Sequence, residues 1–218
     1  MVKWRELLGK KMALQSESTD GQDEEDFSIT LKLLVPGSAA GSIIGKGGAT
    51  INEIQTQTGT RIQLSRNDEV FPGTSDRIVT LGGTITSVLC ALHLIISKLL
   101  RDGAGILVGH DPRLNLVIPN ASCGCILGKG GLTIRNFAED SRADIKLSSQ
   151  GGMLPGVSER ILSIAGPIDC ILRAVALVAT ALSDDPGYEA LVARQSTYTN
   201  FTGGTAVSYT HLTLPTKA

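Results

Sequence analysis

The chain has 218 residues, a formal net charge of −1 and 4% aromatic residues. A membrane span is excluded, because Ser97, Lys98 and Arg101 interrupt the longest apolar run. The first residues, MVKWRELLGKK, lack the apolar centre of a secretion signal, so we expect an intracellular protein of the nucleus, the cytoplasm or both.

Residues 1–27 come first and are predicted to be a disordered acidic tail, since polar segments of this kind cannot bury enough surface to fold. The stretch from Asp20 to Asp26 holds five acids. These acids offset a mildly basic body: residues 31–101 carry seven Lys or Arg against four Asp or Glu, and residues 113–183 carry seven against five. This balance permits a polyanionic partner without requiring one.

Residues 28–101 are predicted to form a first domain in the order strand, helix, helix, strand, strand, helix. Strands are assigned where apolar and polar residues alternate, and helices where apolar residues share one face. The expected elements are a strand at 28–35, a helix at 38–44 capped by Ser38, a glycine loop at 45–48, a helix at 49–58 ended by Gly59, strands at 61–65 and 76–81, and a helix at 84–101.

The same unit occurs a second time, displaced by 128 − 45 = 83 positions, so that Gly45 aligns with Gly128. The alignment runs without a gap from Leu31 to Leu100. Residues 113–185 are therefore predicted to form a second α+β domain of the same element order, after a short linker at 102–112. The linker is short enough for the two domains to touch, but it also allows them to move independently.

Residues 186–218 are predicted to be a disordered C-terminal tail, although Tyr188 to Arg194 can extend a helix. The final stretch, SYTHLTLPTKA, matches no element of either copy. We therefore interpret these last residues as non-native sequence that is not part of the fold.

Each domain carries a glycine-lysine loop between its two short helices, SIIGKGG at 42–48 and CILGKGG at 125–131. Glycines adopt backbone angles that other residues avoid, and the helix that follows directs free N–H groups at whatever lies over the loop. Lys46 and Lys129 add positive charge there. The loops therefore suit a phosphodiester backbone or a similar anion.

Three other interpretations of the loop compete with anion binding. A nucleotide-binding P-loop needs a Ser or Thr after its lysine, but Gly47 follows Lys46. The dinucleotide fingerprint fails because Thr50 stands where it needs a third glycine. A plain helix–helix turn remains possible for one copy, but it has no need of the extra glycines and lysine in both copies.

The stretch SIIGKGGATINEIQTQTGTRIQLS, followed by FPGTSDR, resembles the type I KH domain, in particular the Nova and poly(C)-binding group. The resemblance covers Ser28 to about Asp185. It implies two tandem βααββα units, each a three-stranded antiparallel sheet packed against three helices. It also implies that the loop, called GXXG in this family, clamps the backbone of about four nucleotides of single-stranded RNA.

By position, the resemblance assigns three sets of residues to RNA binding. The loop residues under the backbone are Gly45, Lys46, Gly47, Gly48, Gly128, Lys129, Gly130 and Gly131. The aliphatic floor of the groove is Ile43, Ile51, Ile62, Leu64, Ile126, Ile134, Ile145 and Leu147, all of which also suit a core role. Arg77 and Arg160, at the start of the third strand, read a base edge or are plain surface arginines; a guanidinium can donate two parallel hydrogen bonds.

Poly(C)-binding members carry a second arginine on the helix after the loop, where this chain has Gln55 and Ala138. Gln55 can hydrogen-bond a base and Ala138 cannot, so we predict that the first domain discriminates bases better. Phe71 and Phe137 are the aromatic residues that the groove could use, so ring stacking is not expected to dominate. We expect pyrimidine-rich RNA with a C or CA core, with single-stranded DNA as a second candidate.

The resemblance implies post-transcriptional regulation, such as splicing, stability or translation control, with two domains gaining affinity on one strand. The family usually has a third KH domain, so we expect this chain to be a truncated form. The alternative is a protein-interaction module. It would pair through the first strand and last helix, including Val88–Leu100, to form a homodimer or bind other RNA-binding proteins.

We expect neither catalysis nor a cofactor or metal. His93, His110 and His211 have no nucleophile or paired carboxylate at useful spacing. Cys123 and Cys125 form C-x-C rather than the C-x-x-C of common zinc sites.

Overall fold

The structure is a computed structural model that describes residues 28–103, 107–108, 111–149 and 157–193. The tail expected at 1–27, and residues 194–218 of the second tail, lie outside the described residues. No helix in the described ranges is long and apolar enough to cross a membrane.

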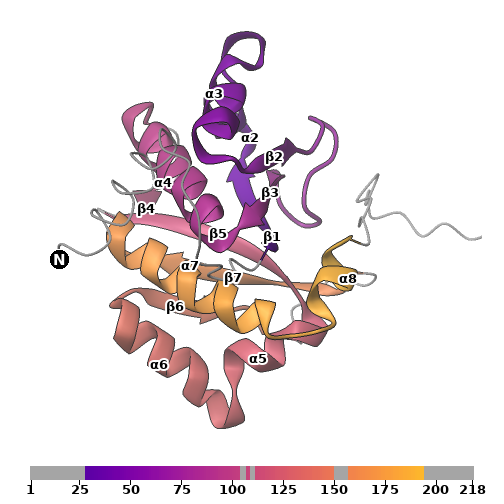
Figure 1. Cartoon of the computed structure of the whole chain (residues 1–218), viewed down its shortest axis with the longest axis vertical. Coiled ribbons are helices and arrows are strands. Elements are labelled where there is room, and N and C mark those ends of the chain that lie inside the picture. Colours follow the sequence, from indigo (N-terminus) through magenta and orange to yellow (C-terminus); the bar gives the residue numbers. More distant parts are fainter. Residues whose placement is uncertain (1–27, 104–106, 109–110, 150–156, 194–218) are drawn as a thin grey trace, which may run out of the picture.

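Both repeats have the predicted order of strand, helix, helix, strand, strand, helix (Figure 1). Repeat 1 consists of β1 (Ser28–Pro36), α2 (Gly37–Ile44), η1 (Lys46–Gly48), α3 (Ala49–Thr58), β2 (Arg61–Leu64), β3 (Asp76–Thr84) and α4 (Ile85–Arg101). Repeat 2 consists of β5 (Asp111–Pro119), η2 (Asn120–Ser122), α5 (Cys123–Leu127), η3 (Lys129–Gly131), α6 (Leu132–Ser141), β6 (Asp144–Leu147), β7 (Glu159–Ala165) and α7 (Ile168–Ser183). The short strand β4 (Leu107–Val108) pairs with β5, and α8 (Tyr188–Ala193) follows repeat 2.

The element boundaries follow from local chemistry. Helix α4 begins after Thr84, whose side chain accepts a hydrogen bond from the Ser87 N–H at 3.2 Å. Helix α3 ends at Gly59 with φ 68°, as predicted. The predicted cap of α2 is wrong, because this helix starts at Gly37, directly after Pro36, and no side chain caps it. Pro36 fixes the backbone angle at that start.

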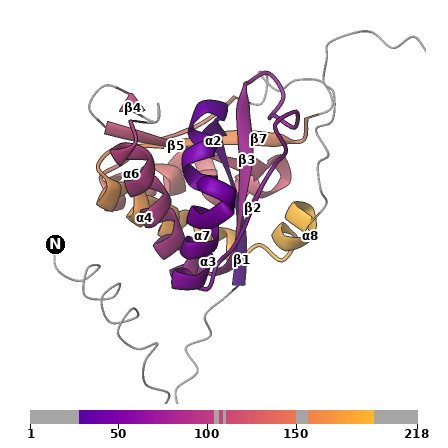
Figure 2. The same ribbon diagram turned by 90° about the horizontal axis from the view of Figure 1, so that it is seen from above.

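The two three-stranded sheets are joined into one. Within repeat 1, β3 lies between β2 and β1 (Figure 2), and repeat 2 has the equivalent order. The first strands of the repeats then pair antiparallel, with Lys32 opposite Val117 and Leu34 opposite Asn115. The sheet order is therefore β2-β3-β1-β5-β7-β6. Of the two possibilities that the linker left open, the structure shows domains in contact.

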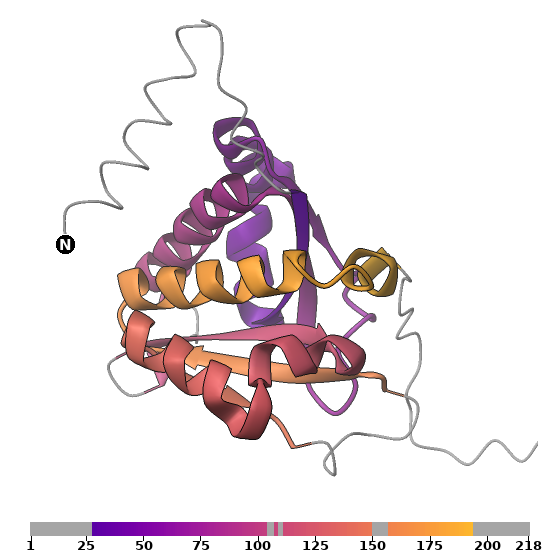
Figure 3. The same ribbon diagram turned by 60° about the horizontal axis from the view of Figure 1, so that its bottom comes forward.

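The helices continue this contact beyond the sheet. Helices α4 and α7 pack against each other, as Figure 3 shows. One cluster of buried side chains contains core residues of both repeats, including Leu33, Leu92, Leu116 and Val175. The residues from Val88 to Leu100, which we considered as a partner surface, contribute much of their apolar area to this shared core. The surface expected to bind another protein is thus largely used within the chain.

A smaller cluster lies on the opposite face of the sheet. Leu34 belongs to it, whereas its neighbours Leu33 and Val35 belong to the main core, as strand alternation requires. Phe71 is only 5% exposed and packs in this second cluster with Val117. The expectation that Phe71 could serve the groove is therefore wrong: it covers the seam between the repeats from the far side. Phe137 is half-buried against the main core.

The chain after repeat 2 is more ordered than we predicted. Tyr188 is 1% exposed and Val192 is 5% exposed, and both belong to the main core. Helix α8 lies beside β1 of repeat 1 (Figure 3). The expectation of a disordered tail from residue 186 is wrong for Tyr188–Ala193, because this short helix is held by tertiary contacts.

Candidate nucleic-acid interface

The loops of both repeats have the same backbone. Gly45, Gly47 and Gly48 have φ of 71°, 60° and 82°, and their counterparts in repeat 2 have 67°, 61° and 77°. A side chain at Gly45 would also place its Cβ 2.8 Å from the backbone nitrogen of Thr50. At Gly47 a Cβ would meet nothing within 4 Å. The first glycine therefore closes the loop, and the third residue of the motif leaves its outer side open.

Each loop ends at an uncapped helix N-terminus. Helices α3 and α6 begin at Ala49 and Leu132, and neither start has a side-chain cap. The N–H groups of Ala49 and Leu132 donate to the carbonyls of Lys46 and Lys129, so what the helix starts offer an anion is chiefly the positive end of the helix dipole. Lys46 and Lys129 are exposed and make no salt bridge to a described residue. The arrangement presents positive charge and hydrogen-bond donors on a surface with little side-chain bulk.

The predicted groove floor divides into two sets. Ile43 and Ile126 are 0% exposed and Ile62 is 5% exposed, so these three are core residues that no ligand can touch in this conformation. The other five pack on the core but keep part of their surface accessible: Ile51, Leu64, Ile134, Ile145 and Leu147. An apolar floor beside the loop can therefore come only from the second set.

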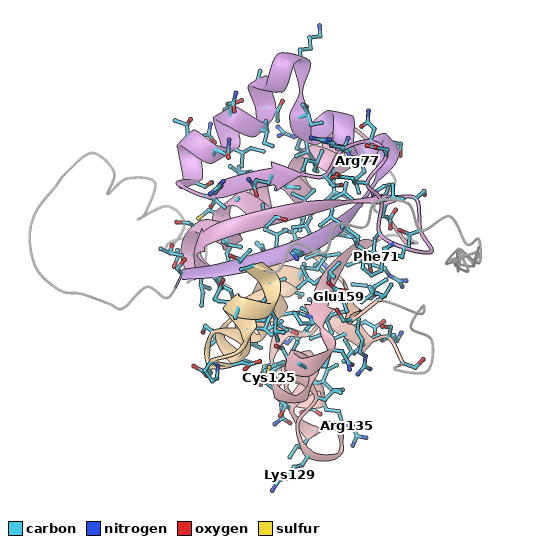
Figure 4. The ribbon with its side chains drawn as sticks, turned by 90° about the vertical axis from the view of Figure 1, so that its right-hand side faces the viewer. Phe71, Arg77, Cys125, Lys129, Arg135 and Glu159 are labelled. Carbon is cyan, nitrogen blue, oxygen red and sulfur yellow. The ribbon has the colours of Figure 1, made fainter. Side chains whose placement is uncertain are left out.

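Two residues beside the loop of repeat 2 are not among the predicted RNA-binding residues. Leu132 is 59% exposed, and it is the first residue of α6, where repeat 1 has Ala49. Arg135 is exposed one turn later and lies near Lys129 at the tip of the molecule (Figure 4). The alignment of the repeats contained the signal, since an arginine replaces Asn52. The loop end of repeat 2 is therefore more basic and more apolar than that of repeat 1.

The two arginines expected to read bases hold the chain itself. Arg77 is 9% exposed; its Nη1 donates to the Asn67 side chain at 2.7 Å and its Nη2 to the Ser65 carbonyl. Arg160 is less buried and donates from both Nε and Nη2 to the single carbonyl of Ser148. Burial raises the pKa of the nearby Cys123 thiol, and Arg160 offsets only part of that rise. Arg160 is thus more accessible to a ligand than Arg77.

Gln55 ties the helix after the loop to the sheet edge. Its Oε1 accepts the Ile62 backbone N–H at 2.9 Å, and its Nε2 donates to Asn52 at 3.4 Å. In repeat 2, Ile145 pairs with Ile164 in the same register as Ile62 with Leu81, so its N–H points the same way. Ala138 has no side chain that can cover that N–H. The Ile62 N–H at the sheet edge therefore has a side-chain acceptor in repeat 1. The equivalent N–H of Ile145 in repeat 2 has no acceptor from Ala138.

The loops lie far apart. Helices α2 and α3 form one end of the long axis and α5 and α6 form the other (Figure 1), with Lys129 at the second end in Figure 4. The strands nearest the two grooves, β2 and β6, are the outer strands of the joined sheet.

The model of the KH domain family matches residues 30–97 and 113–180. This chain belongs to the KH family. The match contains both loops, and each KH repeat is the α+β unit of three strands and three helices that the sequence predicted.

Curated relatives support this assignment. The chain is 32% identical over 185 residues to human "RNA-binding protein Nova-2" and 29% identical over 166 residues to "RNA-binding protein Pasilla" of Drosophila melanogaster. The alignments cover 78% and 72% of this chain but only 37% and 21% of the relatives. Among solved structures, the first KH type I domain of human Vigilin is 19% identical, with a TM-score of 0.30, over 43% of this chain and 95% of that one.

Proposed function

We propose that this chain binds single-stranded RNA with both KH repeats, and that each loop holds the phosphate backbone while the adjoining groove holds bases. The observation that supports this most is the duplicated loop. Two positive-φ glycine loops, each with an exposed lysine and an uncapped helix start, are built for an anion that is extended and lies close to main chain. The names of the two relatives support RNA as that anion.

The preferred RNA is pyrimidine-rich with a C or CA core, and the setting is post-transcriptional regulation in the nucleus, the cytoplasm or both. The half-buried aliphatic floor supports small bases that lie flat. Arg160, which is less buried, is the stronger candidate to read a base edge, and Arg77 serves mainly to hold the loop after β2.

The protein-interaction alternative loses its main surface. It relied on the first strand and last helix of a repeat, but β1 pairs with β5 and α4 packs on α7 within the chain. A homodimer through the same elements would first have to separate the two repeats.

The test is RNA selection with a matched pair of variants. One variant carries Lys46→Asp and Lys129→Asp at the loops. The control carries Arg61→Asp and Lys146→Asp, two exposed positions next to Ile62 and Ile145 whose side chains point to the other face of the sheet. Both variants change the charge equally.

We expect the parent and the control to enrich the same pyrimidine-rich RNAs and the loop variant to lose at least tenfold in affinity while remaining folded by circular dichroism. Equal binding by all three, or no enrichment by the parent, would remove the proposal. Single-stranded DNA of the same sequences, tested in parallel, decides whether the sugar matters.

A further inference from the structure

Helix α8 is an addition to the duplicated unit. The family match ends at residue 180, and α7 ends at Ser183. Of the positions 83 residues before α8, the two that the structure describes, Leu107 and Val108, form the short strand β4. An element that lies outside the family match, and that is nevertheless packed into the core, needs a role of its own.

The contacts of α8 cross from one repeat to the other. Tyr188 donates its hydroxyl to the Thr30 carbonyl at 2.7 Å, and Glu189 accepts the Thr30 N–H at 3.0 Å. Both main-chain groups of one residue of β1 are thus bonded by consecutive side chains that follow repeat 2. The ring of Tyr188 is buried in the shared core, and α8 contacts β5 as well as β1.

The position of Thr30 explains what these bonds achieve. Strand β1 pairs with β5 over only three residues, from Lys32 to Leu34. Thr30 lies on β1 just before this short seam, where the edge facing β5 has no further strand partner in the described residues. Helix α8 occupies that edge. The two hydrogen bonds at Thr30 therefore attach β1 to repeat 2 beyond the end of this seam, in addition to the seam itself and to the packing of α4 on α7.

We propose that α8 is a clamp in which Tyr188 and Glu189 position the two RNA-binding loops by locking β1 of repeat 1 to repeat 2. Neither side chain touches RNA; both act through the orientation of the repeats. The role in RNA spacing rests on the proposed function, but the clamp itself does not. Without the clamp, the loops still bind RNA singly, but the distance between them varies.

The first experiment needs no RNA. Probes introduced by amber suppression at Lys46 and Lys129 report the distribution of distances between the loops. The test variant combines Tyr188→Phe, which keeps the buried ring, with Glu189→Ala. The control, Ala190→Ser, changes an exposed residue of the same helix.

We expect one narrow distribution for the parent and the control, and a clearly broader one for the test variant. The Thr30 amide should also exchange with solvent at least tenfold faster in the test variant. Unchanged distance and exchange would overturn the clamp. Faster exchange with an unchanged distance distribution would also overturn the positioning role, since α8 would then only cover a strand edge.

The second experiment measures affinity for RNAs that carry two pyrimidine-rich sites joined by spacers of increasing length. The parent should show a defined optimum, and the test variant a flatter profile with the same affinity for a single site. Equal profiles would overturn the role in spacing. Failure of the parent to bind any RNA would instead refute the proposed function, and the distance distribution would still decide the clamp.

Discussion

At the scale of single residues, Gln55 and Ala138 give the two repeats different hydrogen-bonding edges. Because Gln55 Oε1 accepts the Ile62 N–H, the outer end of this amide is its NH₂ group, which only donates. Repeat 1 therefore offers a base a donor at a fixed place. Repeat 2 offers main chain at Ile145 instead. We therefore predict that repeat 1 discriminates bases better because it favours bases with a hydrogen-bond acceptor that faces the Gln55 NH₂ group.

The substitutions Gln55→Ala and Ala138→Gln, made in separate chains, test this difference in base discrimination. In a chain with Lys129→Asp, the change Gln55→Ala should reduce the preference of repeat 1 among single-base variants of its RNA by about 2- to 12-fold, the value of one hydrogen bond. In a chain with Lys46→Asp, Ala138→Gln should give repeat 2 a similar preference. Gln57→Ala, on the same helix, is the control. Fluorescence anisotropy with the RNA series measures all of these, and selectivity that stays constant in both exchanges contradicts the prediction.

The loop lysines should determine how strongly salt weakens binding. Each phosphate contact on a single strand contributes about −0.7 to the slope of log K against log salt. Lys46→Ala and Lys129→Ala should therefore each make the slope shallower by about 0.7 on an RNA that spans both sites. Titrations between low and moderate salt give the slope. The pair Arg61→Ala and Lys146→Ala should leave it unchanged, and an equal effect of this pair would mean that the charge acts only at long range.

At the scale of elements, the loop glycines are not equivalent. Gly45 has φ 71° and ψ 179°, a region that only glycine occupies readily, and a Cβ there would collide with Thr50. Gly47 has φ 60° and ψ 24°, which costs other residues less, and its Cβ would point into open space.

We expect Gly45→Ala to lower the free energy of unfolding by about 2–3 kcal/mol and Gly47→Ala by about 1 kcal/mol. Urea denaturation followed by circular dichroism gives both values. Gly128→Ala and Gly130→Ala should repeat the same ranking in repeat 2. A ranking reversed in either repeat would mean that the loop relaxes around the first glycine.

Helix α8 makes stability depend on alkaline pH through Tyr188. Burial raises the pKa of this phenol far above its ordinary value of 10.0. The folded chain therefore keeps the proton where the unfolded chain releases it, so the contribution is complete below pH 10.0 and is lost as pH rises further. The unfolding free energy of the parent should fall by about 1.4 kcal/mol per pH unit more steeply than that of Tyr188→Phe above this pH. Parallel slopes would show that the ring is accessible to water.

The elements themselves were predictable because each has a local signal. Alternation in β1, the glycine after α3 and the repeat at 83 positions all act within a few residues or by direct comparison. Three features had no such signal. These are the docking of α8 on β1, the burial of Arg77 under its own loop, and the pairing of β1 with β5. Each depends on contacts between segments far apart in the chain, and local hydrophobic periodicity does not predict such contacts.

At the scale of the whole molecule, the joined sheet determines how the two sites can share one RNA. The path from β2 to β6 crosses five strand spacings of about 4.8 Å, or about 24 Å along the sheet. Two binding sites placed directly next to each other on RNA cannot reach both loops, because these lie at opposite ends of the molecule (Figure 1).

RNAs with two adjacent sites should therefore bind no better than RNAs with one, and affinity should rise once a flexible spacer can follow the surface between the ends. The gain is expected to be 10²- to 10⁴-fold at the best spacing, as for other linked pairs of weak sites. Isothermal titration with zero, short and long pyrimidine-free spacers measures it. A full gain at zero spacing would contradict the separation of the loops.

The seam between β1 and β5 also has a consequence for synthesis. Repeat 1 leaves the ribosome first, with the β1 edge and the apolar face of α4 still waiting for their partners in repeat 2. At about 5–20 residues per second, the next 83 residues take about 4–17 s to appear. During those seconds the best match for the bare edge is the same edge on a neighbouring nascent chain of the same message. Closely spaced ribosomes on one transcript therefore favour mispairing of β1 edges between nascent chains.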